Sequence, residues 1–137
     1  MMVTVTGLGE IQNNIDAISK RLSYGKVGSI LLRGAKMVQG VVRSKAPRGK
    51  TGNLARGVIS KVLDEKSGYT PVAIVAPDYK ISPHAHLVEY GTKERFHKSG
   101  KSVGKMKKKP FYRPGWDETK YPVLNQILND LKNEVEK

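Results

Sequence analysis

The stretch AHLVEYGT, residues 85–92, decides how this chain is expected to fold, because it couples apolar positions to a glycine turn. Two similar blocks flank it along the chain, APRGKTGNL at residues 46–54 and KPFYRP at residues 109–114. Each block sets Gly or Pro beside apolar residues, as the junctions between elements of a fold do. None of the three assembles a recognisable set of reacting groups, so the pattern favours an architectural protein.

Amphipathic helices are expected on both sides of these blocks. One apolar stripe recurs at steps of three and four residues and predicts a first helix over about residues 9–23. Its members are Leu8, Ile11, Ile15, Ile18 and Leu22. A second stripe predicts a helix that ends near Ala46, because Pro47 disfavours helical geometry in the residue before it. A last helix is predicted over residues 117–135, with one buried stripe. The members of that stripe are Val123, Leu124, Ile127, Leu128, Leu131 and Val135.

Strands are expected between these helices, which gives an α+β fold. Residues 54–63 and 69–76 resemble the two strands of an antiparallel hairpin, and residues 84–90 a third strand. Residues 111–112 are expected as an edge strand, limited by the prolines on either side, and residues 2–6 as a short opening strand. We therefore expect a small antiparallel sheet of about four strands, packed with the N-terminal helices and a C-terminal helix.

Length and composition indicate a single domain over residues 1–137, with a basic flexible arm at about 93–109. The chain has no Cys, which excludes disulfide scaffolds, thiol nucleophiles and thiolate metal sites. No apolar run approaches the roughly 18 residues of a membrane span. The first residues lack the charged and apolar regions of a signal peptide, so we expect a soluble, unprocessed protein.

The charge is strongly basic and unevenly distributed. Lys and Arg total 25 against 12 Asp and Glu, a net charge of +13. Residues 93–113 hold nine basic residues and one acid, whereas residues 117–137 hold five acids and three lysines. Such asymmetry predicts either nucleic acid or a strongly acidic protein as a neighbour, and charge alone does not choose between them. The candidate contacts are Arg48, Lys50, Lys93, Arg95, Lys98, Lys101, Lys105, Lys107, Lys108 and Lys109.

Two patterns that could carry chemistry fail on their spacing. His84 and His86 would share one face of a strand and could hold a cation together, but Glu89 would project from the opposite face. Residues 47–52 combine Gly, Lys and Thr as phosphate-binding loops do. They lack the Walker A spacing, however, and follow a predicted helix where such a loop follows a strand. We therefore expect no catalytic residue, no metal and no cofactor.

The order of these features resembles the HK97 gp10-like family of tailed-bacteriophage proteins. The resemblance rests on a Val-x-Val-x-Gly-Leu opening at residues 3–8, a helical segment, the three blocks in order and a C-terminal helix. The loop at 96–109 is longer and more basic than the family leads us to expect. The residues expected at structural junctions are Pro47, Gly52, Leu54, His86, Glu89, Gly91, Pro110, Phe111, Pro114 and Trp116.

The resemblance implies a structural virion protein without enzymatic activity. Copies would form a ring, expected to be a hexamer, at the head–tail junction, joining the tail to the capsid connector around the DNA channel. The implied partners are connector or head-completion proteins, tail-tube or tail-terminator proteins, and genomic DNA by non-specific contact, with no membrane. The resemblance further implies that Glu89 is bonded locally and that Gly91 makes a turn. The location would be the virion, after assembly in the host cytoplasm.

Two other classes of function stay open. One is a stand-alone basic protein, monomeric or dimeric, that contacts the phosphate backbone of nucleic acid without sequence specificity. No zinc finger, RNP signature or basic zipper is present, so base-specific reading is not expected. The other is a His-dependent hydrolase, which metal content would discriminate.

Overall fold

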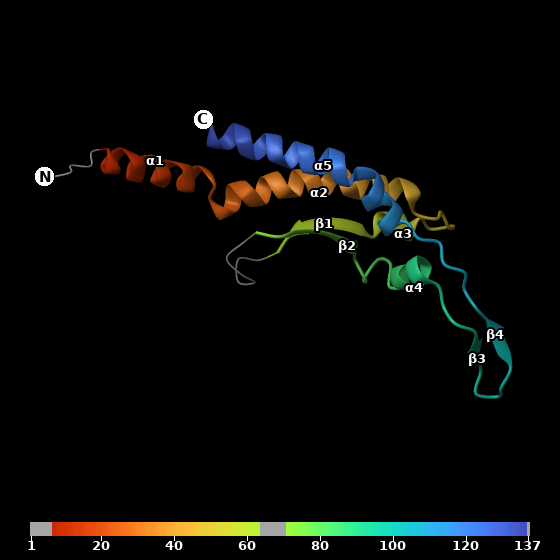
Figure 1. The fold of residues 1–137 in the computed structure, drawn as a ribbon. Helices are drawn as coiled ribbons and strands as arrows, with labels where there is room; N and C mark the ends of the chain where they lie inside the picture. Colours follow the sequence, from red (N-terminus) through yellow and green to blue (C-terminus); the bar gives the residue numbers. More distant parts are fainter. Residues whose placement is uncertain (1–6, 64–70, 137) are drawn as a thin grey trace, which may run out of the picture.

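Two long helices lie side by side and form the spine of the structure (Figure 1). In this computed structural model, which describes residues 7–63 and 71–136, they are α2 (Tyr24–Lys45) and α5 (Tyr112–Val135). The second predicted helix is thus confirmed. It ends just before Pro47, because proline disfavours helical geometry in the residue that precedes it.

Glycines allow the two helices of the spine to pack closely. A Cβ atom built on Gly115 of α5 would lie 2.6 Å from Val42 Cγ2 and 3.2 Å from Val42 Cα. A Cβ atom on Gly34 of α2 would lie 2.8 Å from Ile127 Cδ1. Both positions therefore bring one helix closer to the other than any larger residue would permit.

α1 (Leu8–Arg21) leaves the spine at a break between the first two helices. Ser23 has φ −60° and ψ 156°, an extended conformation that interrupts the helical hydrogen bonding. Arg21 Nη1 donates to the carbonyl of Val135 at 3.0 Å and ties the end of α1 to the end of α5. Most of α1 lies beyond that point (Figure 1). The first predicted helix is confirmed, but part of its apolar stripe is exposed, namely Leu8, Ile11 and Ile15.

β1 (Val58–Val62) and β2 (Ala73–Pro77) form an antiparallel ladder against α2 (Figure 1). The side-chain amide of Gln39 on α2 donates to the carbonyl of Val58 at 2.8 Å and holds this ladder on the spine. The predicted strand over 54–63 is wrong in its first part, because α3 (Asn53–Arg56) occupies it. The turn that connects the two predicted hairpin strands, and the predicted opening strand over 2–6, lie outside the described residues.

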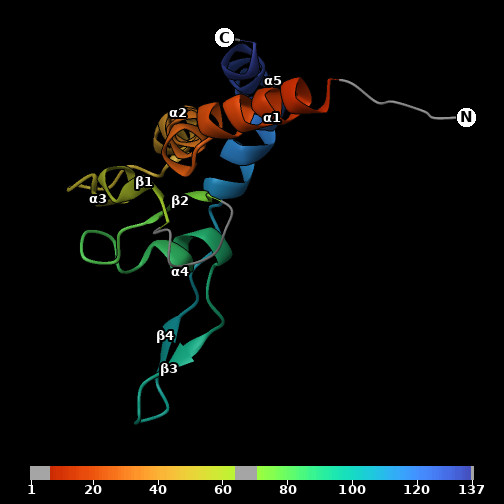
Figure 2. The same cartoon turned by 90° about the vertical axis from the view of Figure 1, so that its left-hand side faces the viewer.

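β3 (Arg95–Phe96) and β4 (Ser102–Gly104) form a second two-stranded antiparallel sheet. The α+β prediction is confirmed. The four strands lie in two sheets rather than one, and β3 and β4 fall in the arm, where no strand is predicted. The β3–β4 hairpin projects away from the spine in both ribbon views (Figures 1 and 2).

The predicted third strand over 84–90 is wrong, because this segment forms the helix α4 (Ala85–Tyr90). Ala85 and Val88 are its buried residues, and their three-residue spacing places them on one helical face. The short run of apolar residues fits either period, so tertiary packing decides the outcome.

The predicted edge strand at 111–112 is wrong as well, because α5 begins at Tyr112 rather than near Asp117. Pro114 stands in the first turn of α5, where a missing N–H breaks no helical hydrogen bond. The predicted buried stripe of this helix is correct only in part. Val123 is 3% exposed, whereas Leu124 is 46% exposed and Leu128 is 62% exposed.

The hydrophobic core lies where α2, α4, β1 and the start of α5 meet. Phe111 is completely buried and is the largest side chain in it. The core members are Val38, Val42, Ala46, Val58, Val88, Phe111 and Val123. No helix within 7–63 and 71–136 is both long and apolar enough to cross a membrane.

Candidate functional site

The carboxylate of Glu89 joins the second sequence block to the third. Its Oε2 accepts the backbone N–H of Phe111 at 2.8 Å and of Tyr112 at 3.1 Å, and its Oε1 accepts that of Arg113 at 3.1 Å. Helix N-termini leave their first N–H groups without intrahelical partners, and a negative charge there is stabilised by the helix dipole. Since Pro114 has no N–H, Glu89 satisfies the whole first turn of α5. Glu89 bonds to a segment far along the chain and not to its neighbours.

The base of the β3–β4 hairpin is fixed at Gly91. This residue has φ +74°, and a Cβ atom on it would lie 2.9 Å from both Met106 O and Lys108 N. Thr92 pairs with Met106 twice: its N–H donates to Met106 O at 2.9 Å, and its Oγ1 accepts the N–H of Met106 at 2.8 Å. Lys109 N donates to the carbonyl of Val88 at 2.8 Å. These hydrogen bonds form a clamp that holds together the two chain segments leaving the core before the hairpin begins.

Beyond this clamp, within the arm at 93–109, β3 and β4 form a hairpin with exposed side chains and one register irregularity between Arg95 and Phe96. His97 N donates to Lys101 O at 2.8 Å, and Gly100 N donates to His97 O at 2.8 Å, which closes the tip. The Ser102 hydroxyl donates to Glu94 Oε1 at 2.7 Å across the strands. The composition of the arm predicts flexibility but not this hairpin, because composition carries no information on hydrogen bonds between backbone groups.

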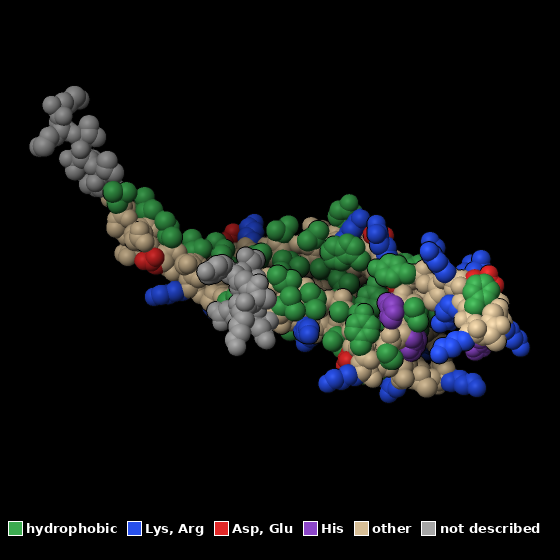
Figure 3. Space-filling model, turned by 90° about the horizontal axis from the view of Figure 1, so that it is seen from below, with side chains coloured by type: hydrophobic (Ala, Val, Ile, Leu, Met, Phe, Trp, Pro, Cys, Tyr) green, Lys and Arg blue, Asp and Glu red, His purple; other side chains and the backbone are tan. Residues whose placement is uncertain are grey.

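The cations of the arm have no ion-pair partner among the described residues, which sets them apart from those of the spine. Lys26, Arg33 and Lys45 on α2 pair with acids of α5, at distances of 3.1, 3.1 and 2.6 Å. Acids of the C-terminal helix thus pair with three of the five cations of α2, whereas the described structure gives none of them a partner in the arm. The uncompensated cations are Lys93, Arg95, Lys98, Lys101, Lys105, Lys107, Lys108 and Lys109. Figure 3 shows Lys and Arg side chains spread over the hairpin end of the molecule.

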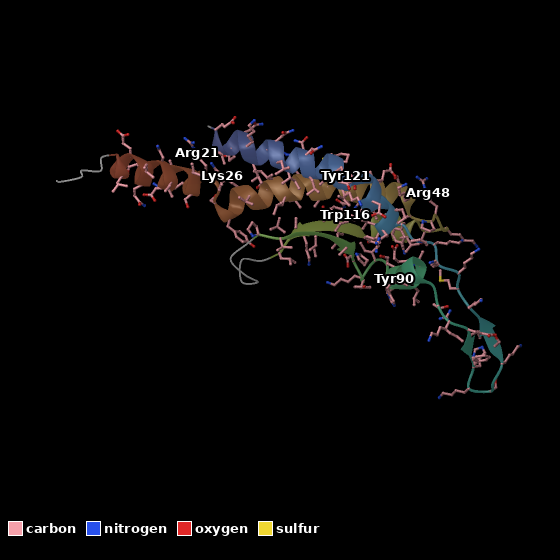
Figure 4. The ribbon with its side chains drawn as sticks, in the orientation of Figure 1. Arg21, Lys26, Arg48, Tyr90, Trp116 and Tyr121 are labelled. Atoms are coloured by element: carbon pink, nitrogen blue, oxygen red, sulfur yellow. The ribbon has the colours of Figure 1, made fainter. Side chains whose placement is uncertain are left out.

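The loop at 47–52 adds two exposed cations, Arg48 and Lys50. Figure 4 shows Arg48 at the end of the spine from which the hairpin projects. Gly52 has φ +65°, a left-handed conformation that glycine adopts readily and that starts α3. Leu54, one of the expected junction residues, packs against the hydrophobic core.

The structure separates the histidines that a metal site would need. α4 begins at Ala85 with His84 as its N-cap, so His84 and His86 do not share one face as they would on a strand. The ring of His86 instead meets Tyr79 edge-on, with the centroids 6.1 Å apart. Within the parts of the chain that the structure describes, no three His, Cys, Asp or Glu side chains gather as metal ligands would.

An apolar groove of about 610 Å³ runs between the spine and the β2–α4 segment. Trp116 and Leu124 line it from α5, and Tyr90 lines it from α4 (Figure 4). Trp116, expected at a junction, is 44% exposed here and is not part of the core. Figure 3 shows the green side chains that surround this hollow. The groove was not predicted from the sequence. The signal that could have revealed it is an amphipathic helix with more apolar residues than its buried face can hold.

Tyr112 lines the groove with a buried hydroxyl that has no hydrogen-bond partner among the described residues. Burial raises the pKa of this phenol to about 12, and the negative charges of Glu89 and Tyr79 act in the same direction. A buried polar atom without a partner is costly, so this hydroxyl is an unmet hydrogen-bonding group in the wall of the groove.

Comparison with known families agrees with this architectural arrangement. The family model HK97-gp10_like, described as "Bacteriophage HK97-gp10, putative tail-component", matches residues 9–91. The matched part covers α1 to α4 and more than half of the 137 residues. No curated protein and no solved structure matches the chain. This chain, with its Glu89 junction and its projecting basic hairpin, therefore belongs to the HK97-gp10-like family of bacteriophage tail components.

Proposed function

We propose that this chain is a structural subunit of the virion that forms a ring, with six copies expected, at the junction of head and tail in a tailed phage. The ring joins the tail to the capsid connector and surrounds the channel through which the DNA passes. Family membership supports a role in the tail. A ring closes when one heterologous interface repeats around an axis, so the subunit needs no active site.

The observation that carries the proposal is the arm at 93–109, which contains the projecting β3–β4 hairpin and holds eight cations that have no acidic partner in the described chain. Such a surface attracts a polyanion or an acidic protein face. In the ring, the hairpins reach either the phosphate backbone of the genome or an adjacent connector, head-completion, tail-tube or tail-terminator ring. Arg48 and Lys50 extend the same basic end.

Neutralising four lysines of the arm at 93–109 tests this role. Replacing Lys105, Lys107, Lys108 and Lys109 with Gln removes four exposed charges but leaves the backbone contacts of the clamp in place. The variant should keep its melting temperature and reduce the joining of filled heads to tails roughly ten-fold or more, since affinity for phosphates depends steeply on the number of contacts. The matched control makes the same change in charge at exposed lysines outside the arm: Lys20, Lys36, Lys61 and Lys80.

The outcomes separate the two partners. If DNA is the partner, the defect appears with packaged heads and not in tails assembled without heads. If a neighbouring ring is the partner, both assemblies suffer. Joining at the wild-type level across low and high salt would contradict a binding role for the arm and leave it as a solubilising loop.

A second candidate function is a stand-alone nucleic-acid-binding protein, which the same uncompensated cations favour. It predicts a monomer or dimer whose affinity for DNA falls with salt and does not depend on sequence. It also predicts that mature particles lack the chain. Quantitative mass spectrometry of purified particles therefore distinguishes the two: a fixed copy number per particle supports the virion subunit, and absence supports the stand-alone protein.

A further inference from the structure

α1 carries an apolar stripe that no described part of its own subunit covers. Leu8, Ile11 and Ile15 are 63%, 54% and 55% exposed, although their spacing places them on one face of the helix. Contiguous apolar side chains on the surface of a protein mark an interaction site more often than a solvated face. The stripe thus behaves as one half of an interface.

The groove between the spine and β2–α4 is an unfilled apolar surface of the opposite shape. α1 cannot reach it within one chain, because α1 leaves the spine beyond the C-terminal end of α5 while the groove lies under the N-terminal half of that helix (Figures 1 and 4). Arg21, bonded to the carbonyl of Val135, anchors α1 at that far end. One subunit therefore presents a convex apolar helix and a concave apolar groove that can meet only between copies.

The charges at the two surfaces are complementary. Residues 8–19 of α1 contain Glu10 and Asp16 without a cation, and the two cations of the helix, Lys20 and Arg21, follow in its last turn, where Arg21 is bonded to Val135. The groove is lined by Arg113, whose side chain is 83% exposed and whose Nε lies 3.9 Å from Asp117, a pair that leaves further guanidinium donors open. The acid that lines the groove, Glu89, is engaged by three backbone N–H groups.

The polar border of the stripe carries hydrogen-bonding groups. Gln12 and Asp16 flank the apolar face of α1 and are hydrogen-bonded to each other at 3.3 Å in an exposed position, a contact that is easily exchanged. A docked α1 brings both apolar side chains and hydrogen-bonding groups to the groove.

We propose that α1 of one copy docks into the groove between α5, α2 and α4 of the next copy, and that this contact is the repeating interface of the assembly. The proposal rests on the ring proposed above and names the surfaces that join its subunits. Such a contact is heterologous, since the helix and the groove are different surfaces, so it propagates around an axis and can close.

Site-directed cross-linking tests this contact directly, since the natural chain has no Cys. One variant carries Ile15→Cys on the stripe together with Leu124→Cys in the groove. A first control replaces Ile15→Cys with Asn13→Cys, which lies about 200° around the axis of the same helix. A second control replaces Leu124→Cys with Leu128→Cys, a more exposed leucine of α5 outside the groove. All are treated with a short bis-maleimide, as concentrated purified protein and in assembled particles.

The docked helix predicts covalent dimers and higher species for the Ile15→Cys and Leu124→Cys pair, at a yield roughly ten-fold above both controls, because docking raises the local concentration of one thiol near the other. Equal yields for the pair and its controls in both samples would overturn the docking. Links from Ile15→Cys to a different virion protein would overturn it too and assign the stripe to that protein. The abundance of the chain in particles, measured separately, decides the proposed function.

A substitution experiment guards against cross-linking by chance encounters. Ile11→Asp with Ile15→Asp changes side chains that are exposed in the subunit, so the melting temperature should not change, whereas association of the purified protein or its incorporation into particles should be lost. Asn13→Asp is the control with a charge on the opposite face of α1. Incorporation of the double variant at the wild-type level would contradict the docking.

Discussion

The carboxylate of Glu89 accepts the backbone N–H of Phe111 at 2.8 Å, although the two residues belong to different sequence blocks. The contact places the start of α5 on α4 and buries the Phe111 ring completely in the core. The basic hairpin leaves the body between these two residues. Its position relative to the spine therefore depends on this carboxylate together with the backbone bonds of the clamp at its base.

Removing the Glu89 carboxylate should destabilise the whole domain. Glu89→Ala leaves the N–H groups of Phe111, Tyr112 and Arg113 without their acceptor, and we expect a loss of about 2–3 kcal/mol in the free energy of unfolding. Glu89→Gln keeps one acceptor oxygen and should lose less. Urea unfolding measures both. The control is Glu94→Ala, whose exposed carboxylate has a single hydrogen bond and should change stability by less than about 0.5 kcal/mol. Equal losses at the two positions would refute the role of Glu89.

The two aromatic residues that flank the start of α5 should differ sharply. Phe111 is fully buried, and Phe111→Ala should cost about 3–5 kcal/mol and reduce the yield of soluble protein. Trp116 lines the open groove and is 44% exposed, so Trp116→Ala should cost much less in the isolated subunit. Thermal unfolding compares them. An unchanged melting temperature for Phe111→Ala would mean that the ring does not anchor α5.

Glycines of the spine offer a matched pair of substitutions with opposite signs. Gly115→Ala forces a Cβ atom to within 2.6 Å of Val42 Cγ2, next to the Val42 backbone, and should destabilise the domain by about 1–3 kcal/mol. A Cβ atom on Gly40 meets nothing within 4 Å, so Gly40→Ala should stabilise α2 by up to about 1 kcal/mol. If both substitutions stabilise the protein, the close packing of α2 on α5 is not correct.

Tyr112 should make stability depend on pH in the alkaline range. Its pKa is raised to about 12, so the folded state favours the neutral phenol. This contribution is complete below the unfolded pKa near 10 and is lost as the pH rises toward about 12. Tyr112→Phe should therefore lose less stability than the natural chain between pH 9 and about 11.5. Melting temperatures across this range measure the difference, and parallel curves for the two proteins would show that Tyr112 titrates normally.

The long helices could be predicted from the sequence because their apolar residues repeat with one clear period. α1, α2 and most of α5 follow from this signal. The segment at 84–90 could not be assigned in the same way, since so short an apolar run fits a strand or a helix. Burial of Ala85 and Val88 on one face selects the helix.

The candidate site could be predicted in its charge but not in its geometry. The cluster of lysines predicts a basic arm, whereas the hairpin ladder and the Gly91 clamp depend on backbone hydrogen bonds between residues that are distant in the sequence. The β propensity of Phe111 and Tyr112 suggested a strand, but capping by Glu89 starts a helix there. The groove appears only in the folded chain, because residues of α2, β2, α4 and α5 line it together.

Localisation of the chain in the virion tests the central claim most directly. Cryo-electron microscopy of the head–tail junction, with this subunit identified by its fold, should show a closed ring around the DNA channel, with each β3–β4 hairpin directed toward the DNA or an adjacent ring. Mass spectrometry of the same particles should give a copy number that matches the ring. Particles that are joined and infectious but contain no density and no peptides from this chain would contradict the claim.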